Sequence, residues 1–170
     1  MTLVICPTDT DETVHPGEAP RAYALRVARE KACAAVVDPV GVQTVLAADT
    51  TVALGDWIPG KPGTPETARN VLLRLSGKTH QVHTAVVVRR GGRQLSAVTT
   101  TSVRFRTLSG AELDRYVATG EPLDRAGGYA IQGGGGALVD RVSGSYTGVV
   151  GLPLRESLAL LRRIGHPLPG

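Results

Sequence analysis

The sequence predicts one α/β domain, over residues 1–170, in which a mixed sheet is flanked by helices. A chain of 170 residues that is 42% hydrophobic can bury one core and is short for two. Segments with strand patterning are interspersed with segments of helical spacing. The dipeptide Gly91-Gly92 separates two strand-like segments and predicts a hairpin, which argues against an all-parallel sheet.

The first part of the chain predicts two strands and a helix. The apolar run Leu3-Val4-Ile5 indicates a short strand, and an acidic loop follows it. Apolar residues at helical spacing predict a helix over residues 21–37, with Pro20 near its start. The β-branched and apolar run from Thr44 to Leu54 predicts a strand that is buried on both faces.

Two further helices are predicted from their ends. Thr64 supplies a cap hydroxyl and Pro65 a first-turn proline, and Gly77 closes the helix that they open. Ser109 and Glu112 have the spacing of a capping box, in which each side chain binds the other residue's backbone N–H. The helix that they open is expected to end near Gly120.

The remaining elements complete the sheet and its cover. The hairpin at Gly91-Gly92 joins predicted strands over residues 81–90 and 93–105, and the second of these alternates strongly. A glycine run over residues 133–136 precedes a predicted strand over residues 137–142. An amphipathic helix over residues 153–164 is expected to stop at Gly165.

Composition excludes several classes of protein. The net charge is +4 with the arginines spread along the chain, so no basic arm for nucleic acid is present, and an aromatic content of 4% argues against stacking platforms for bases. No stretch is apolar enough to span a membrane, and the N-terminus lacks the pattern of a signal peptide. Cys6 and Cys33 have no metal-ligand spacing, which favours reduced thiols in a cytoplasmic protein.

Lysine is rare in this chain, and its positions suggest a site for phosphate. Lys31, Lys61 and Lys78 stand among nineteen basic residues, the rest of which are arginine. An ammonium is a compact charge that fits against one phosphate oxygen. Lys61 follows shortly after the run from Val45 to Thr50, which includes Asp49. An acid at the end of a buried strand and a lysine on the next loop suggest a metal–phosphate site.

Each candidate residue also has an ordinary structural interpretation. Asp49 could hold a metal or take a proton from water, or it could bind nearby backbone. Glu12 could be a solvated loop charge and Lys31 a surface lysine of the first helix. His80 could be a ligand or an acid, although a histidine that opens a strand is more often structural. Gln132, in a glycine-rich segment, could read the edge of a pyrimidine base or belong to a turn.

Taken together and in order, these segments resemble the Maf family of nucleoside triphosphate pyrophosphatases. The resemblance runs from about Val4 to the final helix, and no single motif carries it. The matching segments are Asp11-Glu12, Lys31-Ala32, Ala48-Asp49-Thr50, Gly60-Lys61-Pro62, Leu75-Ser76-Gly77 with His80, Val82 and Thr84, Thr100, Val103-Arg104-Phe105, Tyr116, the run from Ala126 to Gly133, Gly144-Ser145-Tyr146 and the run from Val149 to Leu154.

The resemblance implies a reaction and roles. A nucleoside triphosphate would be hydrolysed between its α and β phosphates, giving a monophosphate and pyrophosphate, with a divalent metal, Mg²⁺ or Mn²⁺. Asp49 would take the proton from water, and Glu12 with Asp49 would hold the metal. Lys31 and Lys61 would bind phosphate oxygens as charge builds in the transition state.

The resemblance also implies a substrate and a fold. Thr50 and Gln132 match positions tied in this family to substrate choice, and the sequence around Gln132 resembles the branch of the family that prefers dTTP and UTP. The implied fold is that of the inosine triphosphatases, a curved mixed sheet in two lobes with a central cleft lined by Asp49, Lys61 and Gln132. A homodimer is a further expectation by resemblance only.

One departure from the family concerns its opening. The family begins with a strand, a Ser-x-Ser-Pro-Arg-Arg loop and a helix, and the sequence given lacks this segment. Either the start is misassigned, which we favour because the other site residues read as intact, or the protein is short and impaired. In the second case the alternative function is a nucleotide-binding regulator without turnover, linked to septum formation. A nucleic-acid-binding domain is a third and weaker alternative.

Overall fold

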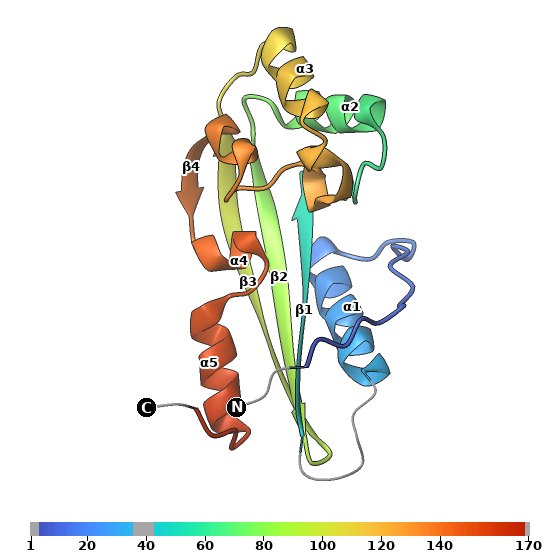
Figure 1. The fold of residues 1–170 in the computed structure, drawn as a ribbon, viewed down its shortest axis with the longest axis vertical. Helices are drawn as coiled ribbons and strands as arrows, with labels where there is room; N and C mark the ends of the chain where they lie inside the picture. Colours follow the sequence, from blue (N-terminus) through green and yellow to red (C-terminus); the bar gives the residue numbers. More distant parts are fainter. Residues whose placement is uncertain (1–3, 36–42, 169–170) are drawn as a thin grey trace.

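The structure is a computed structural model that describes residues 4–35 and 43–168. Four strands, five α-helices and three short 3-10 helices (η) are formed by these residues (Figure 1). In chain order they are α1 (Pro20–Ala34), β1 (Thr44–Ala53), α2 (Pro65–Leu75), β2 (Thr79–Arg90), β3 (Arg93–Phe105), α3 (Gly110–Ala118), η1 (Glu121–Asp124), η2 (Ala126–Gly128), η3 (Gly134–Leu138), β4 (Val139–Ser143), α4 (Tyr146–Val150) and α5 (Leu154–Arg163).

The sheet differs from the mixed sheet that the sequence predicts, because its four described strands are antiparallel throughout, in the order β1-β2-β3-β4. A helix between two strands usually indicates a parallel crossover. Here α2 lies beyond the end of β1 (Figure 1), so the chain turns back alongside that strand instead of crossing the face of the sheet. The hairpin at Gly91 and Gly92 is confirmed, and both residues have the positive φ that the turn requires.

Alternation along β2 allows two helices to cover opposite faces of the sheet. Ala85 and Val87 pack against α1, which contributes a row of alanines. Val86 and Val88 point the other way and pack against Leu160 of α5. Successive strand residues face opposite sides, so each hydrophobic position on β2 buries against a different helix.

The largest core cluster lies at the end of the sheet that carries α2 and α3. Phe105, Leu72 and Leu113 are fully buried there and join β3 to both helices. The predicted caps hold these helices: Thr64 accepts a hydrogen bond from the Thr67 N–H, and Ser109 and Glu112 form the complete capping box. The ends of α2 and α3 read from the sequence are therefore confirmed within one or two residues. The helix predicted over residues 21–37 is α1, which ends earlier, at Ala34; residues 36 and 37 lie outside the described residues.

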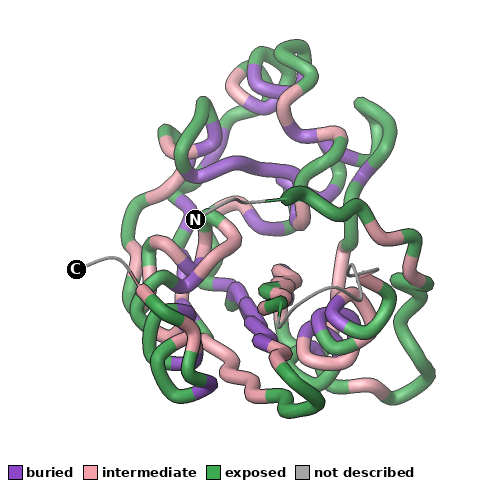
Figure 2. The backbone as a smooth tube through the Cα atoms, turned by 60° about the horizontal axis from the view of Figure 1, so that its bottom comes forward, coloured by how far each residue is buried: buried purple, intermediate pink, exposed green. Residues whose placement is uncertain are grey.

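Two predicted strands are wrong in part. Leu3 lies outside the described residues, while Val4 and Ile5 belong to no strand and are exposed, as is most of the segment before α1 (Figure 2). No described strand pairs with them, and a short apolar run cannot form a strand alone. The predicted strand over Thr44 to Leu54 is formed as β1 from Thr44 to Ala53, but only Thr51, Val52 and Ala53 are buried, because β1 is an edge strand with one neighbour among the described strands.

Candidate active site

Three of the predicted site residues meet around one ammonium group. Lys31 lies in the last turn of α1, and its Nζ is 2.7 Å from Oε1 of Glu12 and 2.8 Å from Oδ1 of Asp49. Asp49 pairs in register with Ala85, whose side chain packs against α1, so its carboxylate points to the helix that presents Lys31. Asp49 lies within β1 and not at its end as predicted, but its side chain is only 10% exposed.

Glu12 is held in place by side chains that the sequence analysis did not single out. The buried Tyr23 of α1 donates a hydrogen bond from its Oη to the Glu12 carbonyl oxygen, at 2.9 Å. One helical turn on, Arg26 donates to the Thr13 carbonyl oxygen and forms an ion pair with Glu18 at 2.7 Å. The i, i+3 spacing of Tyr23 and Arg26 on a helix after an acidic loop was the available signal for this role.

Lys61 reaches the cluster from the loop that follows β1. Its Nζ is 3.8 Å from Oε2 of Glu12, and its side chain is 61% exposed. The preceding residue, Gly60, has a positive φ, and its carbonyl oxygen accepts a hydrogen bond from the Gly127 N–H at 2.9 Å. The lysine loop is therefore tied to the glycine-rich segment that continues to Gln132.

The electrostatics of the cluster keep Lys31 charged between two carboxylates whose pKa values are shifted in opposite directions. Burial raises the pKa of Asp49 even though the Lys31 ammonium acts in the opposite direction. The hydrogen bond from Lys31 lowers the pKa of Glu12, which is less buried. Burial alone would lower the pKa of Lys31, but its two carboxylate partners outweigh burial and raise that pKa. Asp49 is thus the carboxylate better suited to accept a proton.

Two predicted site residues are not brought into this cluster. Thr50 alternates with Asp49 along β1, and its Oγ1 is 3.0 Å from Oγ1 of Thr84, which in turn donates to the Gly148 carbonyl oxygen of α4. Thr50 therefore lies on the opposite face of the sheet. Gln132 is exposed and lies between η2 and η3, and the backbone hydrogen bond of Gly127 to Gly60 ties its segment to the lysine loop.

His80 is a core residue, as its ordinary interpretation held. It is 1% exposed, its Nε2 is 2.8 Å from the Tyr129 Oη, and its ring packs edge-on against Phe105 and Tyr129. Its Nδ1 is buried without a hydrogen-bond partner. Burial lowers the pKa of His80 to about 4, so the imidazole is neutral near pH 7.

The cluster suits a hard divalent cation only with ligands from outside the protein. No group of three or more His, Cys, Asp or Glu side chains with metal-binding geometry occurs in residues 4–35 and 43–168. Glu12 and Asp49 nevertheless direct their oxygens at one positive charge, and one or two carboxylates completed by water and phosphate oxygens are the usual protein share of a Mg²⁺ site. The donor set therefore fits Mg²⁺ or Mn²⁺.

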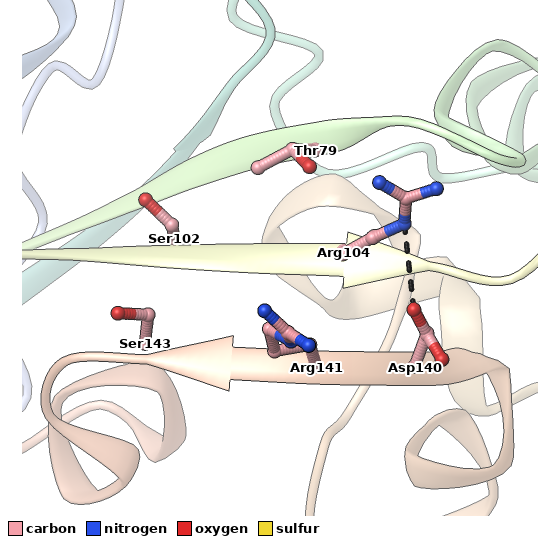
Figure 3. A pocket seen from close by; sticks show the side chains of 6 residues that line it. All are labelled: Thr79, Ser102, Arg104, Asp140, Arg141 and Ser143. Carbon is pink, nitrogen blue, oxygen red and sulfur yellow. Dashed lines mark ion pairs between the residues drawn. The ribbon is translucent and has the colours of Figure 1, made fainter.

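Two of the hollows on the described surface are lined by neither Asp49 nor Lys61. One of about 260 Å³ lies over β2, β3 and β4, where Arg104 and Asp140 form an ion pair at 3.4 Å (Figure 3). Its lining residues are Thr79, Ser102, Arg104, Asp140, Arg141 and Ser143. The other, of about 540 Å³, lies beside α1 and includes Asp11, next to Glu12, and Glu30, next to Lys31. Neither hollow is the cleft predicted between two lobes, which stays a prediction.

Two carboxylates and two ammonium groups thus gather beside an edge strand and a helix of this α/β protein. The chain belongs to the Maf family, since the model described as "Maf-like protein" matches residues 1–164. Among helices of the described residues, none has the length and apolar character needed to cross a bilayer.

Curated relatives cover nearly the whole chain. A dTTP/UTP pyrophosphatase of Anaeromyxobacter dehalogenans (strain 2CP-1 / ATCC BAA-258) is 57% identical over 99% of this chain and 87% of its own length. Proteins of the same name from Myxococcus xanthus (strain DK1622) and Chromobacterium violaceum are 53% and 49% identical, over 98% and 95% of this chain and 84% and 83% of their own lengths. The resemblance read from the sequence motifs is confirmed.

Proposed function

We propose that this protein hydrolyses dTTP and UTP to the nucleoside monophosphate and pyrophosphate. The observation that carries the proposal is a chain of ion pairs among residues far apart in sequence: Lys31 pairs with both Glu12 and Asp49, and Lys61 pairs with Glu12. The names of the relatives supply the substrates, because the cluster itself recognises only phosphate and charge.

In the proposed reaction Asp49 accepts a proton from the attacking water. The oxygen of that water forms a bond to the α-phosphorus, the bond from this phosphorus to the bridging oxygen breaks, and pyrophosphate leaves with the electron pair of that bond. A carboxylate whose pKa is raised by burial is a better base than an exposed one. Its low exposure also limits the number of competing water molecules.

The two lysines act as preorganised cations for the triphosphate. The Lys61 side chain is the more exposed of the two, so it meets the substrate first. Lys31 is held by two carboxylates and exchanges one of them for a phosphate oxygen as the substrate binds. Placing charge where the phosphates develop more negative charge stabilises the transition state more than the ground state.

Glu12 and Asp49 are the residues that would hold a divalent metal. When bound, the cation neutralises and orients the triphosphate. Base selection falls to Gln132, whose amide offers both a donor and an acceptor to a pyrimidine edge. We place the base beside the η2–η3 segment and the phosphates beside α1, with the predicted cleft between them. Thr50 contributes to substrate choice only indirectly, through the β1 backbone that it shares with Asp49.

Pyrophosphate release from dTTP in the presence of Mg²⁺ or Mn²⁺ tests the proposal. Asp49→Asn is expected to lower kcat by about 10²–10⁴-fold, the usual contribution of a positioned base. Asp140→Asn changes the same chemistry in the distant hollow of Figure 3 and should leave turnover unchanged. Tight binding of dTTP without pyrophosphate release would instead support the nucleotide-binding regulator, and equal activity of Asp49→Asn and the parent protein would remove Asp49 from its role.

A further inference from the structure

The glycine-rich segment that carries Gln132 is fixed by a tyrosine and a glutamate from outside it. Glu121, at the start of η1, accepts hydrogen bonds from the Gly134 N–H at 2.9 Å and the Gly135 N–H at 3.2 Å. The Tyr116 hydroxyl of α3 donates to Glu121 at 2.8 Å and accepts from the Ala130 N–H at 3.2 Å. We call this pair of side chains the clamp.

Glycine is required where the clamp approaches the backbone. A Cβ on Gly133 would lie 2.6 Å from the Glu121 carboxylate oxygens, and one on Gly135 would lie 2.7 Å from the Tyr116 Oη. A Cβ on Gly135 would also meet the Ala130 backbone, and one on Gly133 would displace the Glu121 carboxylate, so glycine at these positions permits the clamp to approach the backbone. A run of glycines usually makes a backbone more flexible. In this structure it instead lets the backbone N–H groups of the segment reach the clamp side chains and bind them.

Gln132 lies between this clamp and a second anchor. On its N-terminal side, Tyr129 is bound to the buried His80 at 2.8 Å, and Ile131 is buried in the main core. On its C-terminal side the clamp holds Gly134 and Gly135. The exposed amide of Gln132 therefore projects from a backbone that is fixed within two or three residues in both directions.

The clamp depends on charge as well as shape. Burial alone would raise the pKa of Glu121, but the hydrogen bonds from Gly134, Tyr116 and Gly135 outweigh it and lower that pKa. Glu121 is therefore ionised near pH 7, and hydrogen bonds to an ionised acceptor are about twice as strong as neutral ones.

We propose that Tyr116 and Glu121 are positioning residues for base selection, acting through the backbone that aims Gln132. The proposal rests on the function proposed above, in which Gln132 reads the pyrimidine. Within residues 4–35 and 43–168, neither side chain has a hydrogen bond or ion pair to the carboxylate and lysine cluster. The clamp should therefore affect which base is accepted more than the rate of the chemical step.

Two conservative variants remove parts of the clamp. Glu121→Gln keeps the shape but replaces one of the two acceptor oxygens with an NH₂ group, so that one of the two backbone N–H donors loses its acceptor and the negative charge is removed. Tyr116→Phe removes only the hydroxyl. Glu112→Gln is the matched control, since it weakens the capping box of α3 and the ion pair with Arg106 at 2.7 Å without touching the glycine-rich segment. Thermal unfolding of the three variants shows whether the clamp variants and the control lose similar amounts of stability, so that a difference in exchange is not a general loss of stability.

The first measurement is amide hydrogen exchange of the peptide that spans residues 129–136, which needs no turnover. Exchange should be at least tenfold faster in Glu121→Gln and Tyr116→Phe than in Glu112→Gln. The second is the ratio of kcat/KM for dTTP to kcat/KM for dATP, which should fall about tenfold in the clamp variants, through KM and with kcat little changed.

Equal exchange in the clamp variants and the control overturns the clamp. Faster exchange with an unchanged dTTP to dATP ratio overturns its role in base selection. If the parent protein releases no pyrophosphate from any triphosphate, the proposed function fails, and the exchange measurement still decides whether the clamp holds the segment.

Discussion

Acid should destabilise this protein through His80 before its carboxylates are titrated. The perturbation is a shift from pH 7.5 to pH 5. At the lower pH the imidazole of an unfolded chain is protonated, while folded His80 resists protonation because it is buried and has no acceptor for a hydrogen on Nδ1. The unfolded state then binds more protons than the folded state, so the free energy of unfolding falls as the pH falls.

The size of the effect follows from the two pKa values of His80. Burial lowers its pKa from 6.5 to about 4. The loss therefore begins near pH 6.5, reaches about 2 kcal/mol at pH 5, and levels off near about 3 kcal/mol below pH 4. The pKa values of Glu18 and Glu112 are lowered to about 2, so their protonation costs stability mainly below their ordinary value of 4.5. Burial raises the pKa of Asp49, an effect of opposite sign that is shared by the parent and a His80 variant and cancels between them.

Urea unfolding followed by the fluorescence of Trp57, the single tryptophan, measures this effect. The parent protein should lose about 2 kcal/mol between pH 7.5 and pH 5, whereas His80→Gln, which does not titrate there, should lose much less. His83, whose pKa burial also lowers, contributes equally to both proteins and cancels. The exposed His15 gives the control, since His15→Gln should keep the full loss. Equal losses in the parent and His80→Gln would refute the reasoning.

Three other substitutions test the packing that supports the site. Gly127→Ala should lower the free energy of unfolding by about 2–3 kcal/mol, because Gly127 has a positive φ and the new Cβ would lie 2.7 Å from Val52. Gly55 also has a positive φ but has open space around it, so Gly55→Ala should cost only about 1 kcal/mol in the same urea titration. Lys31→Met should lower the free energy of unfolding by about 1–3 kcal/mol, because it leaves two carboxylates without their common ammonium. Mg²⁺ should raise the Tm of this variant more than that of the parent, with Lys78→Met as the control. An equal Mg²⁺ shift in the variant and the parent would count against a shared site. Thr64→Ala should cost about 1 kcal/mol through loss of the α2 cap, whereas Thr64→Ser should cost little, as circular dichroism on heating can determine.

Local features of this fold could be predicted because local chemistry determines them. The hydroxyl of Thr64, the reciprocal pair of Ser109 and Glu112, and the turn at Gly91-Gly92 each specify the backbone within a few residues. The direction of β2 relative to β1 could not be predicted in this way. It depends on where α2 packs, and that is decided by the core that Leu72 and Leu113 share.

The sequence by itself determined which residues could carry the chemistry, since the ordered motifs named Glu12, Lys31, Asp49, Lys61, Thr50 and Gln132. Only the tertiary structure decided which of them meet. Register and alternation in β1 turn Asp49 toward the lysine of α1 and Thr50 toward α4, although the two residues are neighbours in the chain. Alternation separates these two residues onto opposite faces, but the helix that packs against each face is selected by burial of the whole apolar surface.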